Sequence, residues 1–199
     1  MDSLEILRKL IEQQQYESLL ELCEKYWDQQ PDPAILGIRS FACTLLGKNE
    51  QAHAFLSQAL QHQQDLDADA LTDLVAALIV QEEVDTAIDI LDSLLATNPR
   101  HSLALGRRAY CYFVQGDLKK AEEYFERSAQ IEPTKIAVLD HLARIILTRK
   151  DYQKAASVIQ QGFQQLAVQR EDMPAALAQG YWQSLTDMQS EIRASEPPE

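Results

Sequence analysis

The chain has 199 residues, of which 46% are hydrophobic and 25% are charged, and its formal net charge is −13 at pH 7. A strongly acidic surface repels phosphate groups, so the composition argues against a nucleic-acid partner and against binding to anionic membranes. Because there are only 6 Gly and 7 Pro and no useful alternation of apolar and polar residues, we expect an all-helical chain that is folded over nearly its whole length.

The first 32 residues predict a helical hairpin of irregular sequence. A first helix is expected over residues 2–13, where Asp2 is a suitable cap. The glutamine run Gln13–Gln15 marks a turn, and a second helix follows that Pro31 ends. An irregular pattern suits a terminal unit, because its outer side faces solvent.

The next two hairpins turn at short polar segments. The second begins near Pro33 and turns at Gly47–Asn49, and the third turns at Gln81–Glu83 and ends at Pro99. Proline is tolerated in the first turn of a helix, where its missing N–H has no helical partner, and elsewhere it ends a helix.

The fourth hairpin, Leu105–Pro133, has the most regular sequence. It turns at Gln115–Asp117, and the three residues Ala121, Phe125 and Pro133 follow at the spacing A-x3-F…P. An alanine also occurs 34 residues before Ala121, at Ala87, and 34 residues after it, at Ala155. A proline occurs 34 residues before Pro133, at Pro99. A fixed period of this length predicts stacked supersecondary units.

This pattern resembles the tetratricopeptide repeat family. The resemblance implies an all-α, right-handed superhelix of about five hairpins, at residues 1–32, 33–67, 68–101, 102–135 and 136–169. Two residues depart from the family pattern, since Arg39 and Arg108 stand where the family usually has leucine. We expect these two helices to present a charge to solvent or to a neighbouring acid.

The end of the chain predicts a capping helix over residues 172–193, with Asp172 as its cap. Its expected buried face comprises Ala176, Leu177, Gly180, Tyr181, Leu185, Met188 and Ile192. The fifth hairpin turns at Lys150–Asp151, and its second helix is expected to run on toward Val168. The sequence thus predicts one repeat domain over residues 1–193 and a disordered tail over residues 194–199.

The resemblance places a peptide-binding groove on the inner faces of the first helices of the hairpins. The candidate groove residues are Ile38, Phe41, Leu45, Asp73, Val80, Arg107, Tyr110, Val114, Asp140, His141 and Arg144. Such a mixed groove suits an extended or helical peptide with hydrophobic anchors, and the Lys and Asn pattern of relatives that clamp a carboxylate is missing. Two alternatives stay open. Phe41, Tyr110 and Val114 are partly core residues that pack between adjacent hairpins, or Arg107 and Arg144 pair with the acids Asp73 and Asp140 on neighbouring units.

Nothing in the sequence indicates catalysis, a cofactor or a metal. The four histidines are dispersed along the chain without paired ligand spacing, and no nucleotide-binding or nucleophile motif is present. Adjacent carboxylates such as Glu122 and Glu123 are interpreted as solvated. The start of the chain does not have the pattern of a secretory signal, no stretch is long and apolar enough for a membrane span, and the odd, dispersed set of 3 Cys fits reduced thiols. We therefore expect a cytoplasmic protein.

The leading hypothesis is a non-catalytic scaffold or adaptor that holds a peptide or helix of a partner protein in its groove. One alternative is a cytoplasmic chaperone for a secreted or membrane-inserting client, which the acidity and the apolar groove also fit. Another is an interaction module that works with a larger enzyme. Self-association through the final helix or the first hairpin is a separate alternative.

Overall fold

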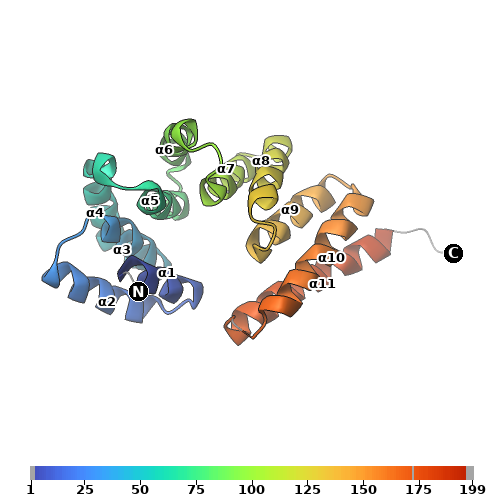
Figure 1. Cartoon of the computed structure of the whole chain (residues 1–199), viewed down its shortest axis with the longest axis horizontal. Coiled ribbons are helices and arrows are strands. Elements are labelled where there is room, and N and C mark those ends of the chain that lie inside the picture. Colours follow the sequence, from blue (N-terminus) through green and yellow to red (C-terminus); the bar gives the residue numbers. More distant parts are fainter. Residues whose placement is uncertain (1–2, 172, 196–199) are drawn as a thin grey trace. The chain divides into compact units, whose positions relative to one another are not determined.

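The fold is described from a computed structural model, in which residues 3–171 and 173–195 are placed well enough to describe. Every regular element in these ranges is helical, as the sequence predicts (Figure 1). The elements are α1 (Ser3–Glu12), α2 (Tyr16–Gln29), α3 (Ala34–Leu45), α4 (Asn49–Gln61), η1 (Gln63–Asp65), α5 (Ala68–Val80), α6 (Val84–Thr97), α7 (Ser102–Val114), α8 (Leu118–Ile131), α9 (Ile136–Thr148), α10 (Tyr152–Gln169) and α11 (Ala175–Ser195). The predicted caps Asp2 and Asp172 and residues 196–199 of the predicted tail lie outside the described residues.

Each of the five hairpins turns through one residue in the left-handed backbone region. These residues are Gln14, Gly47, Glu82, Gly116 and Lys150, with φ values of 56°, 71°, 66°, 80° and 62°. At Gly116, its own N–H donates to Phe113 O at 3.0 Å and the following N–H, of Asp117, donates to Tyr112 O at 2.9 Å. This pair of bonds is the Schellman motif, and the same pair recurs at the other four turns. The motif satisfies the last carbonyls of each first helix and reverses the chain.

The chain divides into two compact units, residues 1–99 and residues 100–199. The first unit contains α1 to α6, and the second contains α7 to α11. The 34-residue period runs through the boundary, so the sequence pattern does not indicate this division. Each unit is described by itself.

In the first unit, close backbone contact joins the second and third hairpins. A Cβ added at Gly37 of α3 would lie 2.9 Å from the backbone nitrogen of Leu74 in α5. On the same helix, the buried Ser40 donates to Ala52 O at 2.8 Å and accepts from Gln81 Nε2 at 2.7 Å. These contacts explain why small residues occupy this helix at points where the hairpins meet.

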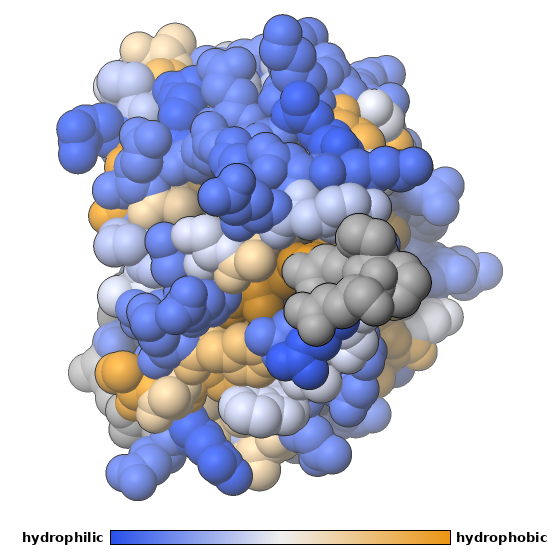
Figure 2. All heavy atoms as spheres, turned by 90° about the vertical axis from the view of Figure 1, so that its right-hand side faces the viewer, coloured by the Kyte–Doolittle hydropathy of each residue, from blue (hydrophilic) through white to orange (hydrophobic). Residues whose placement is uncertain are grey.

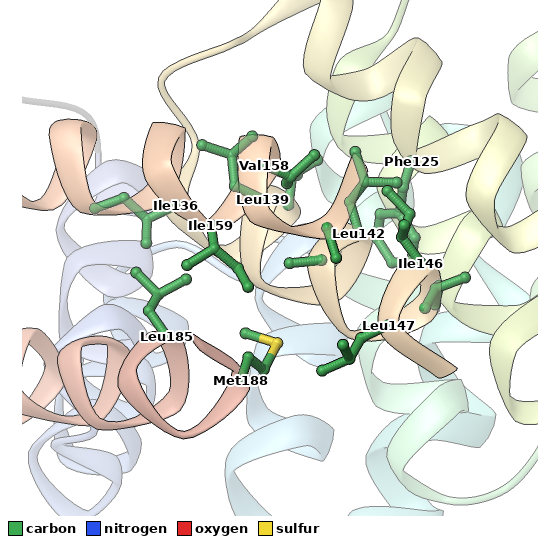
Figure 3. Packing of buried hydrophobic residues seen from close by; sticks show 14 of the residues in the cluster. Phe125, Ile136, Leu139, Leu142, Ile146, Leu147, Val158, Ile159, Leu185 and Met188 are labelled. Carbon is green, nitrogen blue, oxygen red and sulfur yellow. The ribbon is translucent and has the colours of Figure 1, made fainter. Parts of the chain in front are cut away.

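The second unit is built around one apolar core. Hydrophilic side chains cover most of the face shown in Figure 2, and a band of apolar side chains is exposed between them. Figure 3 shows the buried core of this unit, to which Phe125 of α8, Leu142 of α9, Ile159 of α10 and Leu185 of α11 all contribute. The repeat alanines Ala87, Ala121 and Ala155 are all fully buried, as a small residue at a helix crossing requires.

The two unexpected arginines are placed against aromatic rings. The guanidinium carbon of Arg39 lies 3.9 Å from the ring centroid of Phe55, and the guanidinium carbon of Arg108 lies 4.3 Å from that of Tyr112. Arg39 also lies within 4.0 Å of Glu24. Planar guanidinium groups stack well on aromatic faces, which lets arginine occupy a position that usually holds leucine.

The final helix α11 packs against both α9 and α10. Its buried residues are Ala178, Leu185, Met188 and Ile192. The predicted buried face was therefore only partly right, because Ala176 and Gly180 are exposed. Their positions lie on the side of the helix away from its buried residues, because the helix repeats every 3.6 residues and a count of three- and four-residue steps drifts around it.

Candidate functional site

The predicted groove residues fall into two sets, one in each unit. In the first unit, Ile38 is fully buried and Asp73 is buried at 8% exposure, whereas Phe41 and Val80 are half-buried. Leu45, at the C-terminal end of α3, is 44% exposed. Ile38 is thus a core residue in this structure, and Leu45 is the one of the five with the most accessible apolar surface.

An ion pair joins α1 to α5 in the first unit. Arg8 Nε donates to Asp73 Oδ2 at 2.9 Å, and Asp69 lies 3.9 Å from the same guanidinium. Tyr16 makes an edge contact with Phe41, with their ring centroids 6.4 Å apart. Asp73 therefore serves to hold helices together, and we predict that Phe41 and Leu45 contribute more to binding than Asp73 does.

In the second unit, five of the predicted residues form a surface that we call the second-unit face. It comprises Arg107, Tyr110 and Val114 of α7 and His141 and Arg144 of α9. The ring centroid of Tyr110 lies 5.6 Å from that of His141 in an edge contact, so the facing sides of α7 and α9 meet here. Val114, at the end of α7, is 51% exposed.

His141 occupies the centre of this face. Its ring stacks on Phe125, with centroids 5.5 Å apart, while Tyr110 lies against it edge-on. Burial lowers the pKa of His141, and the nearby positive charges of Arg144 and Arg107 lower it further against the opposing effect of Asp140. The imidazole is therefore neutral at pH 7 and acts as a flat packing surface between the two arginines.

Asp140 is the sixth predicted residue of this unit, and its charge is neutralised from within. Ser184 of α11 donates a short hydrogen bond to Asp140 Oδ1, and Arg144 lies 3.4 Å from Asp140 Oδ2. Arg144 also donates to Ser184 Oγ at 2.8 Å. Arg144 therefore pairs with Asp140 within the same helix, and not with an acid of a neighbouring unit as the alternative expected. No repeat pattern marks Ser184, so the sequence reasoning missed its role.

The second-unit face presents positive and aromatic groups on an acidic chain. Arg107 and Arg144 lie near a Tyr and a neutral His, and the carboxylate of Asp140, which pairs with Arg144, is buried at 8% exposure. Guanidinium groups bind carboxylates through paired hydrogen bonds, and exposed apolar surface accepts an apolar side chain. This face is thus suited to a segment that combines an apolar residue with an acid.

The interpretation of Glu122 as a solvated carboxylate was wrong. Glu122 is buried at 7% exposure, and it accepts hydrogen bonds from Arg149 and Lys154. Because these bonds join α8 to α9 and α10, the carboxylate has a structural role. The sequence did not indicate this, since the partners lie 27 and 32 residues away.

In the described part of the chain, no group of three or more His, Cys, Asp or Glu side chains is placed to hold a metal ion. No helix in the same ranges is long and apolar enough to cross a membrane.

Comparison with known proteins identifies the repeats. The family model described as Tetratricopeptide repeat matches residues 72–135, whereas no curated protein sequence matches the chain. A tetratricopeptide repeat protein of Thermus thermophilus, TTC0263, has a similar structure with a TM-score of 0.72 and 18% identity, covering 92% of this chain and 97% of that one. PilW, a type IV pilus biogenesis factor, matches with a TM-score of 0.67 and 19% identity over 97% of this chain and 91% of its own.

A third similar structure is the pilF protein of Pseudomonas aeruginosa, with a TM-score of 0.64 and 14% identity over 98% of this chain and 96% of that one. At such low identity, these three likenesses establish the fold alone. Residues 72–135 thus belong to the tetratricopeptide repeat family, and with the helical hairpins on either side the chain has the fold of tetratricopeptide repeat proteins.

Proposed function

We propose that the protein is a non-catalytic interaction scaffold whose second-unit face binds a short segment of a partner protein. The bound segment carries an apolar side chain, which lies against Tyr110 and Val114, and a nearby carboxylate, which pairs with Arg107 or Arg144. The observation that carries the proposal is the arrangement of these side chains around a neutral, half-buried His141, with Asp140 already paired with Arg144.

The charge balance supports an acidic rather than a basic segment at this face. The chain as a whole is at −13, which would attract basic partners over a distance. At the second-unit face, however, the exposed Arg144 and the half-buried Arg107 supply positive charge. The charge of the bound segment is decided by ion pairs formed at the binding surface, where water is excluded. We therefore predict a segment whose charge is opposite to that of the second-unit face, whatever the net charge of the chain.

The first-unit face is proposed as an additional apolar contact for a partner. Phe41, Leu45 and Val80 supply partly exposed apolar surface there, beside the paired Arg8 and Asp73. A module of this kind binds single segments with affinities on the order of micromolar, and linked segments bind more tightly.

The location we propose is the cytoplasm. Cys23, Cys43 and Cys111 are all buried free thiols, which fits a reducing compartment.

Selection from a random peptide library tests the second-unit face. We expect peptides enriched on the wild-type protein to carry an aromatic or large aliphatic residue close to an Asp or Glu. Val114→Glu places a carboxylate on this exposed position, so it should weaken binding of the enriched peptides at least about tenfold, as like charges that face each other do. Affinities are measured by fluorescence anisotropy.

The matched control adds the same charge at another exposed helical position. Ala54→Glu on α4 should leave the affinity unchanged. Enrichment of basic peptides, or equal affinity for wild type and Val114→Glu, would refute the proposed face. Circular dichroism of both variants establishes that the helices are intact.

A further inference from the structure

A pocket of about 570 Å³ lies at the bend of the α10–α11 hairpin, where α10 ends and α11 begins. The two helices run side by side within the second unit (Figure 1). We call this pocket the hairpin groove, and its lining includes Leu166, Ala167, Arg170, Ala175, Ala178 and Trp182. A volume of this size is in the range of pockets that hold a ligand or several side chains of a partner.

The lining of the hairpin groove follows one stripe on each helix. On α11, Ala175, Ala178, Gln179 and Trp182 are spaced i, i+3, i+4 and i+7, so they share one face of the helix. This stripe extends about 10 Å along the axis, because each residue of a helix rises 1.5 Å. Small side chains on the facing stripes leave the space between the helices unfilled, and the groove is therefore about two helical turns long.

Trp182 is the largest side chain of the hairpin groove, and a ligand can reach it. It is 57% exposed, while an edge contact with Phe163, with ring centroids 5.0 Å apart, supports it from one side. The half-buried Met173 also lines the groove, and its flexible side chain adapts to irregular shapes. A supported, partly exposed tryptophan is the kind of residue that contributes strongly to binding energy in protein interfaces.

The described lining of the hairpin groove carries one charge, the guanidinium of Arg170. No Asp, Glu, Lys or Arg occurs at residues 155–169 or 173–186, which form the two sides of the groove. Arg170 is exposed and directly follows α10, whose C-terminal carbonyl groups favour a nearby cation. The neighbouring Glu171 is exposed and does not belong to the lining. The charge that complements this groove is therefore negative, and its place is at the bend.

We propose that the hairpin groove binds one helix of a partner protein. Apolar side chains of that helix lie against Trp182 and Leu166, and an acidic residue at one end of its apolar stripe pairs with Arg170. A helix fits because its residues at i, i+3, i+4 and i+7 recur over the same length of about 10 Å that the groove offers. The groove lies on α10 and α11, whereas the second-unit face lies on α7 and α9, so this site does not depend on the function proposed for that face.

Three helical probe peptides of about 16 residues test the proposal with the full-length chain. All three carry leucines at i, i+3, i+4 and i+7, and they differ only in the residues that flank this stripe at both ends, which are Glu, Gln or Lys. On the wild type, the Glu peptide should bind about fivefold more tightly than the Gln peptide, as a partly exposed ion pair allows, and the Lys peptide should bind most weakly. Arg170→Glu should reverse this order.

Trp182→Ala should weaken the binding of all three peptides at least about tenfold, because it removes the largest apolar contact of the groove. Affinities are measured by fluorescence anisotropy at an ionic strength of about 0.15 M, which screens charges farther than about 8 Å from the groove. Circular dichroism of each variant establishes that its helices are intact. Since Arg170 is exposed, its reversal tests the site independently of any effect of Trp182→Ala on folding.

Matched controls change the same kinds of side chain outside the hairpin groove. Arg193→Glu reverses a charge in the last turn of α11, and Val168→Ala shortens an exposed apolar residue of α10 that does not line the groove. Both variants should bind the peptides like the wild type. Val114→Glu of the second-unit face should do so as well, so failure of one proposed site is distinguished from failure of the other.

Four results would overturn the proposal. Absence of binding for all three peptides at about 1 mM would exclude a helix-binding groove. A Lys peptide that binds the wild type as tightly as the Glu peptide, or an order that Arg170→Glu leaves unchanged, would remove the role of Arg170. Peptide binding that Trp182→Ala does not weaken would place the contact elsewhere. A wild-type dimer in sedimentation equilibrium that Trp182→Ala abolishes would assign the groove to a second copy of the chain.

Discussion

The left-handed turn residues allow one stability prediction to be worked out in detail. Lys150 is the turn residue of the fifth hairpin, with φ 62°. This left-handed backbone conformation brings its Cβ close to the following carbonyl oxygen. An L-residue in this region costs about 1–2 kcal/mol, and glycine removes that strain. Glycine also increases the freedom of the unfolded chain, which offsets about 0.4–1 kcal/mol. Lys150→Gly should therefore stabilise the protein by roughly 0.5–1 kcal/mol.

The reverse change is available in the same unit. Gly116 closes the fourth hairpin at φ 80°, and a Cβ there would have no atom within 4 Å. Gly116→Ala should thus destabilise by a similar roughly 0.5–1 kcal/mol, because the backbone conformation is strained without any steric clash. Urea unfolding followed by circular dichroism measures the free energy of unfolding of both variants. In thermal unfolding, Tm should move by about 2–4 °C per kcal/mol, upward for Lys150→Gly and downward for Gly116→Ala.

Lys150→Ala separates backbone strain from loss of the lysine side chain. This variant keeps a Cβ at the left-handed position, so it should show none of the gain. If Lys150→Gly is no more stable than Lys150→Ala, the assignment of strain to the turn is refuted.

Three further predictions concern buried groups. Gly37→Ala should lower the free energy of unfolding by about 1–3 kcal/mol in urea unfolding, because the added Cβ would lie 2.9 Å from Leu74 N; unchanged stability would contradict the close approach of α3 and α5. Burial lowers the pKa of His141 below 6.5, so the unfolded chain binds the proton more readily and stability should be lost as pH falls below that value. His141→Phe should reduce this loss when unfolding is compared at about pH 7 and about pH 5, and an identical pH dependence would argue against it. Burial raises the pKa of Cys23 to about 12, against a small opposing effect of Arg39, so this thiol should resist a disulfide reagent at neutral pH until the protein unfolds. Rapid labelling of Cys23 in the native protein, detected by mass spectrometry, would show that it is accessible.

The helical hairpins and their turns could be predicted from the sequence. The spacing of Ala87, Ala121 and Ala155 placed the crossings, and all three alanines are buried. The polar segments placed the turns, including Glu82 and Lys150, where no glycine marks the left-handed residue. Such features are local and repeat along the chain, so periodicity reports them directly.

The candidate site could be predicted only in part. Periodicity brought Arg107, Tyr110, His141 and Arg144 to corresponding positions of neighbouring units, and the structure places Tyr110 against His141. It did not reveal that Ile38 is fully buried. A position on the inner side of a helix is exposed or buried according to the residues that neighbouring helices supply, and the repeat pattern does not specify them.

The sequence by itself determined the helical class, the repeat unit and its turns, because helix periodicity and turn chemistry act over a few residues. Only the tertiary structure decided which charges are neutralised inside the protein. Asp73 pairs with Arg8 from 65 positions away, and Glu122 pairs with Arg149 and Lys154. Asp140 accepts a hydrogen bond from Ser184 of the final helix in addition to its pair with Arg144. It also decided that Gly180 and Trp182 face outward. These outcomes depend on the packing of residues distant in sequence.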